Sequence, residues 1–88
     1  MAIPRSLGRY EVIELLGLGG MAALYRARDP RIGRNVAIKQ LRPQFDTPEL
    51  RDRFAREAAA AGGLSHANIV TIYDVGEEDG LPFIAMEF

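Results

Sequence analysis

A glycine-rich segment and a single lysine are the features of this sequence whose residue types could do chemistry together. Gly17, Leu18, Gly19 and Gly20 follow an apolar segment, and backbone N–H groups with no side chain in the way can approach phosphate oxygens closely. Lys39 is the single lysine among eleven basic residues, and an ammonium group at a fixed position would complement the same phosphate. The glycines alone are equally compatible with a simple hairpin turn.

Glu57 is the acidic residue that could hold Lys39 in place. It lies on or beside the apolar stripe of an expected helix, where a carboxylate buried without a partner is costly. A pair with Lys39, which has apolar neighbours in an expected strand, would present a positioned charge to a phosphate. The alternative is an exposed pair of Glu57 with Arg53, worth only about 0.3–0.5 kcal/mol. The residues alone leave both pairings open.

Composition excludes several classes of protein. The 88 residues suffice for one small domain, and 48% hydrophobic with 26% charged residues is ordinary for a globular chain. Eleven basic and twelve acidic residues nearly cancel, so we expect no nucleic-acid partner. The absence of cysteine excludes disulfide scaffolds and cysteine nucleophiles. With His66 as the single histidine we expect no metal site, and we interpret His66 and Asn68 as loop residues.

No targeting segment is visible in the sequence. The first residues lack the apolar run of a signal peptide. No stretch approaches the roughly 18 apolar residues of a membrane span. We therefore expect a cytoplasmic chain with no membrane segment.

The apolar pattern predicts an antiparallel sheet of five strands with one packed helix, an α+β fold. The connections are short, which favours antiparallel pairing, and Asp79-Gly80 closes a predicted hairpin loop over Gly76–Gly80. The segment 21–28 is ambiguous, because its residue types favour a helix and its length favours a strand. The clearer strands are expected at 10–16, 35–41, 69–75 and 81–88.

The helix lies between the third and fourth strands. Thr47 is the expected N-cap, followed by Pro48 at the first helical position. Gly62-Gly63 supplies the stop. The residues that share one apolar stripe are Leu50, Phe54, Ala58 and Ala61.

Four motifs in order resemble the N-terminal lobe of a protein kinase, most of all the bacterial serine/threonine kinases of the eukaryotic-like type. They are Gly17-x-Gly19-x-x-Ala22-x-Leu24, Val36-Ala37-Ile38-Lys39, Glu57 in the following helix, and His66-Ala67-Asn68-Ile69-Val70. The resemblance implies a leader at residues 1–8 and a partial kinase domain, the N-lobe alone, at residues 9–88.

The resemblance also implies ATP as the ligand and a protein hydroxyl as the substrate. The glycine-rich segment Gly17–Gly20 would cover the ATP phosphates, Lys39 would contact the α- and β-phosphates, and Glu57 would hold Lys39. Leu24 and Ala37 would enclose the adenine. Met86 would lie behind it, and Glu87 and Phe88 would begin the segment whose backbone binds the adenine edge.

The sequence departs from the family pattern in three places. Ala22 replaces the third glycine, and we expect weakened rather than abolished binding. Leu24 replaces the usual valine. The motifs H-R-D-x-x-x-x-N, D-F-G and A-P-E do not occur, and in the family they supply the catalytic base and the magnesium ligands. We therefore expect Mg²⁺ only with a further lobe, and an inactive isolated chain.

Two other functions stay open at this stage. Gly17-x-Gly19-x-x-Ala22 also fits a dinucleotide-binding unit, which requires a helix at 21–28, although no acidic residue ends the strand at 35–41. A non-catalytic module is the other alternative. It would bind a partner, such as a second kinase molecule, through the last strand and the helix stripe.

Overall fold

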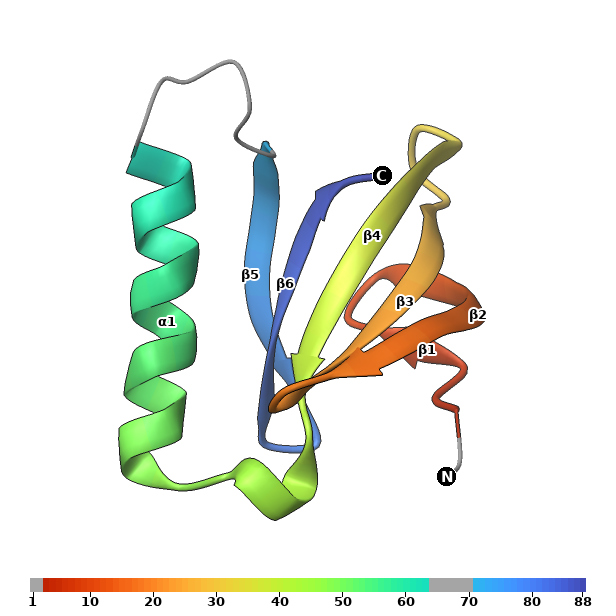
Figure 1. Cartoon of the computed structure of the whole chain (residues 1–88). Helices are drawn as coiled ribbons and strands as arrows, with labels where there is room; N and C mark the ends of the chain where they lie inside the picture. The colour runs from red at the N-terminus through yellow and green to blue at the C-terminus, as the bar shows by residue number, and fades with distance from the viewer. Residues whose placement is uncertain (1–2, 64–70) are drawn as a thin grey trace.

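A six-stranded sheet and one long helix make up the described part of the chain, as Figure 1 shows. The structure is a computed structural model that describes residues 3–63 and 71–88. The elements in chain order are strands β1 (Ser6–Leu7), β2 (Tyr10–Gly19), β3 (Ala22–Asp29) and β4 (Arg34–Leu41), the 3-10 helix η1 (Pro43–Phe45), helix α1 (Pro48–Gly63), and strands β5 (Ile72–Glu78) and β6 (Leu81–Glu87).

The predicted α+β architecture is confirmed, with one strand more than expected. All pairs are antiparallel, in the order β1-β2-β3-β4-β6-β5. The sequence analysis missed β1 because two residues are too few to show a periodic pattern. Leu7 pairs with Tyr10 across a tight turn in which Gly8 has a φ of +58°. Leu7, assigned to the leader from the sequence, is fully buried.

The segment that was ambiguous between helix and strand is strand β3. Ala23, Tyr25 and Ala27 are buried, and the residues between them are half-buried or exposed, which is the period-two pattern of a strand. β3 pairs with both β2 and β4, so pairing and burial outweigh the helix propensity of its alanines. A dinucleotide-binding unit would need a helix here, so that alternative is wrong.

The last two strands meet in a tighter turn than expected. β5 continues to Glu78, which pairs with Leu81, so the predicted loop over Gly76–Gly80 shortens to two residues. These are Asp79 and Gly80, with φ values of +52° and +78°. Positive φ at both positions is the requirement of the hairpin turn that Asp-Gly favours. The Asp79-Gly80 turn is confirmed. The two strands are longer than predicted, because their residues pair as far as Glu78 and Leu81, directly beside the turn.

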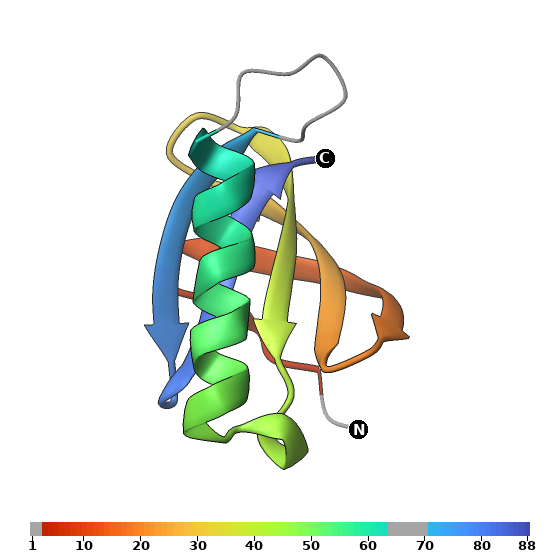
Figure 2. The same ribbon diagram turned by 60° about the vertical axis from the view of Figure 1, so that its left-hand side comes forward.

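The two faces of the sheet carry separate apolar clusters, because side chains alternate along each strand. Helix α1 lies across one face, as Figures 1 and 2 show together. The cluster on this face, called here the helix-side cluster, consists of Ala22, Leu41, Phe54, Ala58 and Ile84. The cluster on the other face, called here the inner cluster, consists of Leu7, Tyr10, Ala23, Tyr25, Ala27, Val36, Ile38, Phe83 and Ala85.

Polar contacts draw the two ends of the sheet together around the inner cluster. Asp74 of β5 accepts a hydrogen bond from the Tyr10 hydroxyl at 3.3 Å and pairs with the Arg9 guanidinium at 3.0 Å. The backbone N–H of Gly8 donates to the Glu78 carboxylate at 2.9 Å. Burial raises the pKa of the Tyr10 phenol, and the Asp74 carboxylate raises it further. Since β5 stands at the opposite end of the strand order from β1, the sheet is curled.

Helix α1 begins and ends where the sequence predicted. The Thr47 hydroxyl oxygen accepts a hydrogen bond from the N–H of Leu50 at 3.2 Å, which makes Thr47 the N-cap. The helix ends at Gly63. From the predicted stripe, Phe54 and Ala58 are buried in the helix-side cluster and Leu50 is half-buried. These few side chains attach the helix to the sheet.

Some predictions fall outside the described residues. They are the loop roles of His66 and Asn68, the start of the strand expected at 69–75, and the packing of the Ala61 side chain. Within the described part of the chain, no helix combines the length and apolar character needed to cross a membrane.

Gly76→Ala should destabilise the fold. A Cβ atom at this position would lie 2.9 Å from the Phe83 ring, which is buried in the inner cluster and meets the Tyr10 ring edge-on. Extra methyl groups in a packed core cost about 1–3 kcal/mol, so the free energy of unfolding in urea should fall by that amount. Gly17→Ala is the control, because a Cβ there meets no atom of the described chain within 4 Å. Equal losses in both variants would contradict the packing around Phe83.

Candidate functional site

A cavity of about 420 Å³ lies beside the turn between β2 and β3. In Figure 1 this turn lies next to the C-terminal end of β4, the strand that carries Lys39. The structure thus brings the glycine-rich segment and the single lysine into one site. The residues that line the cavity are Gly17, Leu18, Gly19, Ala22, Ala23, Leu24 and Lys39.

The strand register explains why these residues meet. Leu24 lies directly opposite Gly17 on β2 and opposite Lys39 on β4. Lys39 in turn lies opposite Ile84 of β6, a member of the helix-side cluster. Side chains of directly opposed residues project from the same face of a sheet. The lysine and the apolar Leu24 therefore lie on the face that carries α1.

The glycine-rich turn is bonded to the chain after β4 at one side, and its glycines are uncovered. The N–H of Arg42 donates to the carbonyl oxygen of Met21 at 2.9 Å, which ties the turn to the chain after β4. Gly20 has a φ of +53°, a conformation that glycine adopts at no steric cost. A Cβ atom at Gly17 or Gly19 would meet no atom of the described residues within 4 Å. A ligand can therefore approach the backbone closely.

Ala22 stands where the kinase resemblance expects a third glycine, and its methyl group takes part in packing. It is 4% exposed and belongs to the helix-side cluster with Leu41 and Phe54. Ala22 lies opposite Gly19 on β2 and opposite Leu41 on β4. The methyl group therefore joins the end of the glycine-rich turn to the core beneath α1, a contact that glycine could not make.

The other residues assigned to the adenine do not line the cavity. Ala37 is buried and lies opposite Met86, which is half-buried against the helix-side cluster. Glu87 ends β6, and both Glu87 and Phe88 are exposed. The guanidinium carbon of Arg26 lies 5.9 Å from the centre of the Phe88 ring. Ala37 and Met86 thus continue the sheet face of Lys39 away from the glycine-rich turn, whereas Glu87 lies opposite Val36 of the inner cluster.

Exposed leucines flank the turn, and the sequence analysis overlooked one of them. Leu16, Leu18 and Leu24 leave 44%, 49% and 36% of their surface in water. Leu16 is the extra residue where the β2 register shifts between Leu15 and Gly17, a β-bulge. The paired leucines before the first glycine, which break the alternation, were the signal. Leu18 and Leu24 line the cavity, and apolar side chains exposed there indicate the apolar part of a ligand.

Glu57 pairs with Arg53 in this structure, one of the two pairings that the residues alone left open, and not with Lys39 as the kinase resemblance implies. Its carboxylate lies 3.4 Å from the Arg53 guanidinium nitrogen, and both side chains are exposed. The helix turns Phe54 and Ala58 toward the sheet, so Glu57 stays at the solvated flank and nothing forces it toward the lysine. Within the described residues Lys39 makes no ion pair.

Sequence comparison relates the chain to bacterial kinases. The model of the protein kinase domain matches residues 10–88. The chain is 47% identical, over its whole length, to a probable serine/threonine-protein kinase of Streptomyces coelicolor. It is 48% identical, over 96% of its length, to the serine/threonine-protein kinase PrkC of Bacillus subtilis. It spans 14% and 13% of the length of these two relatives.

Solved structures agree with the sequence comparison. The kinase domain of PknI from Mycobacterium tuberculosis matches 99% of this chain with a TM-score of 0.77 and 33% identity, and the chain covers 36% of it. The apo form of PpkA-294 matches with a TM-score of 0.82 at 22% identity, which supports the fold alone. The chain therefore belongs to the protein kinase family, and its curled sheet and helix are the N-terminal part of a protein kinase domain.

Proposed function

We propose that this chain is the ATP-binding lobe of a serine/threonine protein kinase. The longer protein would transfer the γ-phosphate of ATP to a protein hydroxyl group, and the use of ATP would place this lobe in the cytoplasm. The observation that carries the proposal is the open glycine-rich turn that shares one cavity with Lys39. The 88 residues correspond to 14% of the length of a relative, so transfer would need residues beyond them.

The ATP phosphates fit the polar side of the cavity. Backbone N–H groups of residues 17–20 can donate to phosphate oxygens, because no described atom covers Gly17 or Gly19. Lys39 would bring its ammonium group to the α- and β-phosphates. The lysine is half-buried, and charges attract more strongly there than in bulk water. The turn and the lysine would together bind and orient the triphosphate.

The adenine ring fits the apolar side of the same face. Leu24 and Ala37 would contact the ring, and the exposed Leu24 would lose water contact on binding. Met86, which lies opposite Ala37, would close the rear of the adenine site. The backbone of Glu87 and Phe88 would hydrogen-bond the edge of the ring. Adenine and phosphates would then lie along one face of β3, β4 and β6.

Magnesium and the catalytic base would come from elsewhere in the kinase domain. The family supplies them from the H-R-D-x-x-x-x-N and D-F-G motifs, and neither motif occurs in these 88 residues. Across residues 3–63 and 71–88, no three His, Asp or Glu side chains are grouped as a metal site requires. When bound, Mg²⁺ neutralises charge on the phosphates. The residues of this chain would bind and orient ATP, and the chain alone would transfer no phosphate.

Glu57 would act in a second position of the helix. Its exposed pair with Arg53 is worth only about 0.3–0.5 kcal/mol. A movement of α1 toward the cavity would let the Glu57 carboxylate leave Arg53 and hold the Lys39 ammonium group instead. Glu57 would then fix the lysine in the direction of the phosphates.

Lys39→Met should weaken ATP binding by roughly 10–100-fold, since a hydrogen bond to a charged group contributes about 1.5–3 kcal/mol. A fluorescent ATP analogue titrated into the kinase that contains this lobe measures the binding. Phosphate transfer to a protein substrate, followed with radiolabelled ATP, should be lost in the same variant.

Arg28→Met is the control for this experiment, because Arg28 is an exposed cation on β3 that does not line the cavity. It should leave binding and transfer unchanged. Normal binding and transfer by the Lys39→Met variant would remove Lys39 from its proposed role. A wild-type protein that binds no ATP would instead favour the non-catalytic module.

A double-mutant cycle identifies the partner of Glu57. Without nucleotide, Glu57→Gln and Arg53→Gln should each change the free energy of unfolding by less than about 0.5 kcal/mol, with a coupling of about 0.3–0.5 kcal/mol between them. The matched cycle of Glu57→Gln with Lys39→Met should show no coupling. A coupling to Lys39 of about 1 kcal/mol or more in the absence of ATP would contradict the pairing with Arg53.

A further inference from the structure

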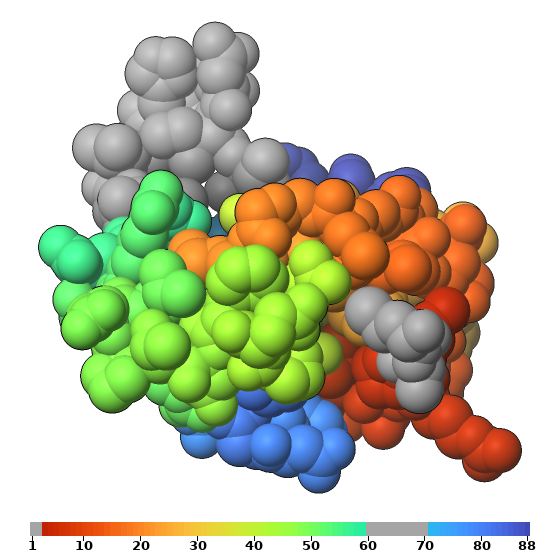
Figure 3. All heavy atoms as spheres, turned by 60° about the horizontal axis from the view of Figure 1, so that its bottom comes forward, coloured from red at the N-terminus to blue at the C-terminus, as the bar shows by residue number. Residues whose placement is uncertain are grey.

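A second cavity, of about 660 Å³, opens at one end of the curled sheet. Its lining comes from residues 3–7, the middle of β3, the end of β4 with the segment after it, and the β5–β6 turn. Figure 3 looks onto this end, where the red N-terminal residues, the lime segment after β4 and the blue β5–β6 turn come together. The binding of ATP proposed above makes no use of this cavity.

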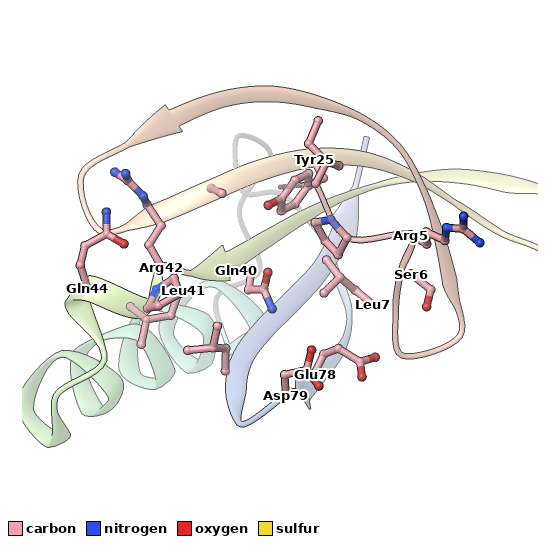
Figure 4. Close-up of a pocket in the computed structure, with 15 residues that line it drawn as sticks. Arg5, Ser6, Leu7, Tyr25, Gln40, Leu41, Arg42, Gln44, Glu78 and Asp79 are labelled. Atoms are coloured by element: carbon pink, nitrogen blue, oxygen red, sulfur yellow. The ribbon is translucent and has the colours of Figure 1, made fainter. Parts of the chain in front are cut away.

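Two buried polar side chains face this cavity. Tyr25 is 2% exposed and Gln40 is 9% exposed, and Figure 4 shows both beside the same hollow. Among the described residues, neither the Tyr25 hydroxyl nor the Gln40 carboxamide makes a hydrogen bond. Neither group is among the buried polar atoms that lack a partner in the described chain, so both are accessible from the open cavity. The pair is thus poised to bond something that enters the cavity.

The register places these groups on the face opposite Lys39. Tyr25 lies opposite Ile38, and Gln40 lies opposite Phe83; both partners belong to the inner cluster. Burial raises the pKa of the Tyr25 phenol, so the hydroxyl keeps its proton at neutral pH and can donate. A ligand bound here would not compete with ATP for space.

The walls of the cavity are apolar, and its rim carries charges of both signs. Leu7 and Leu41 are fully buried and Leu81 is half-buried around the hollow. Arg5 and Asp79 lie on different sides of the opening in Figure 4. Both are exposed, and neither forms an ion pair with another described residue. The ligand should be apolar at its centre and charged at both ends.

We propose that this cavity docks an extended peptide segment of a partner protein. A peptide unit offers one N–H donor and one carbonyl acceptor, and the Gln40 carboxamide can pair with both. An aliphatic side chain of the peptide would fit beside Leu7 and Leu81, which line the cavity. A basic side chain would lie near Asp79 and an acidic one near Arg5.

The free edge of β1 supports a peptide over a compact small molecule. β1 is the outermost strand of the sheet, and its two residues, Ser6 and Leu7, line the cavity. A strand edge without a neighbour is a template for an added strand. An extended peptide added beside β1 would bond this edge and Gln40 together, because both line the same cavity.

A displayed library of random 12-residue peptides, selected on the wild-type protein, tests the proposal. Enriched peptides should share an aliphatic residue between a basic and an acidic one. Their affinity, measured by fluorescence anisotropy, should fall at least tenfold for the double variant Tyr25→Phe/Gln40→Leu. Lys39→Met, on the opposite face, should leave it unchanged, and ATP should not displace the peptide.

Several outcomes would overturn the proposal. They are no enrichment over a selection on the double variant, equal affinity for both proteins, displacement by ATP, or binding of N-acetyl-leucine methylamide as tight as that of the peptide. Tyr25→Phe alone keeps the test decisive if the double variant does not fold, and it should bind at least threefold more weakly. Its melting temperature should equal or exceed that of the wild type. A lower one would mean that the hydroxyl is already bonded within the protein.

Discussion

The register of β3 against β4 is the constraint on which both cavities depend. It sets Leu24 opposite Lys39 on the face that carries α1, and Tyr25 opposite Ile38 on the other face. A slip of one residue would turn Lys39 into the inner cluster, where an unpaired ammonium group is very costly. The same slip would expose Ile38, which is fully buried. Because Ile38 is buried on the inner face, Lys39 is kept on the face that carries α1.

The curl of the sheet gives the two faces different shapes. Asp74 holds Arg9 and Tyr10 near β5, and this closes the inner cluster while leaving a hollow at one end. At that end Arg51 of α1 contacts Asp46 at 2.5 Å and Glu77 at 2.9 Å. Surface ion pairs contribute little stability one at a time. Here they hold the start of α1 against the end of β5, because the backbone hydrogen bonds of the sheet do not join these two elements.

Local signals in the sequence predicted the glycine-rich turn and the strand that carries Lys39, and tertiary contacts decided what these signals could not. The glycine-rich turn was predictable because it follows an apolar strand pattern, and Lys39 because it lies within another one. β3 was ambiguous because alanine packs well in either structure, and two flanking strands decided it. β1 was missed because its stability comes from the burial of Leu7 and its pairing with Tyr10, not from a pattern. Leu16 was overlooked because a bulge hides it from period-two reasoning.

The partner of Glu57 could not be predicted, because it depends on where α1 lies. Both Arg53 and Lys39 are suitable cations, and the sequence does not give the distance between α1 and β4. Phe54 and Ala58 hold the helix against the sheet, and apolar contacts of this kind have no preferred direction. A weak exposed pair with Arg53 is then enough to decide where the helix rests.

A ligand changes the balance between two positions of the helix only by the difference in its affinity for them. Under the proposed function, phosphates that draw Lys39 toward the glycine-rich turn would supply that difference, because Glu57 would orient the lysine toward them. Tenfold in relative population requires about 1.4 kcal/mol, which exceeds what the Arg53 pair contributes. A helix held by non-directional contacts and a weak surface pair is therefore one that a free-energy difference of this size can reposition.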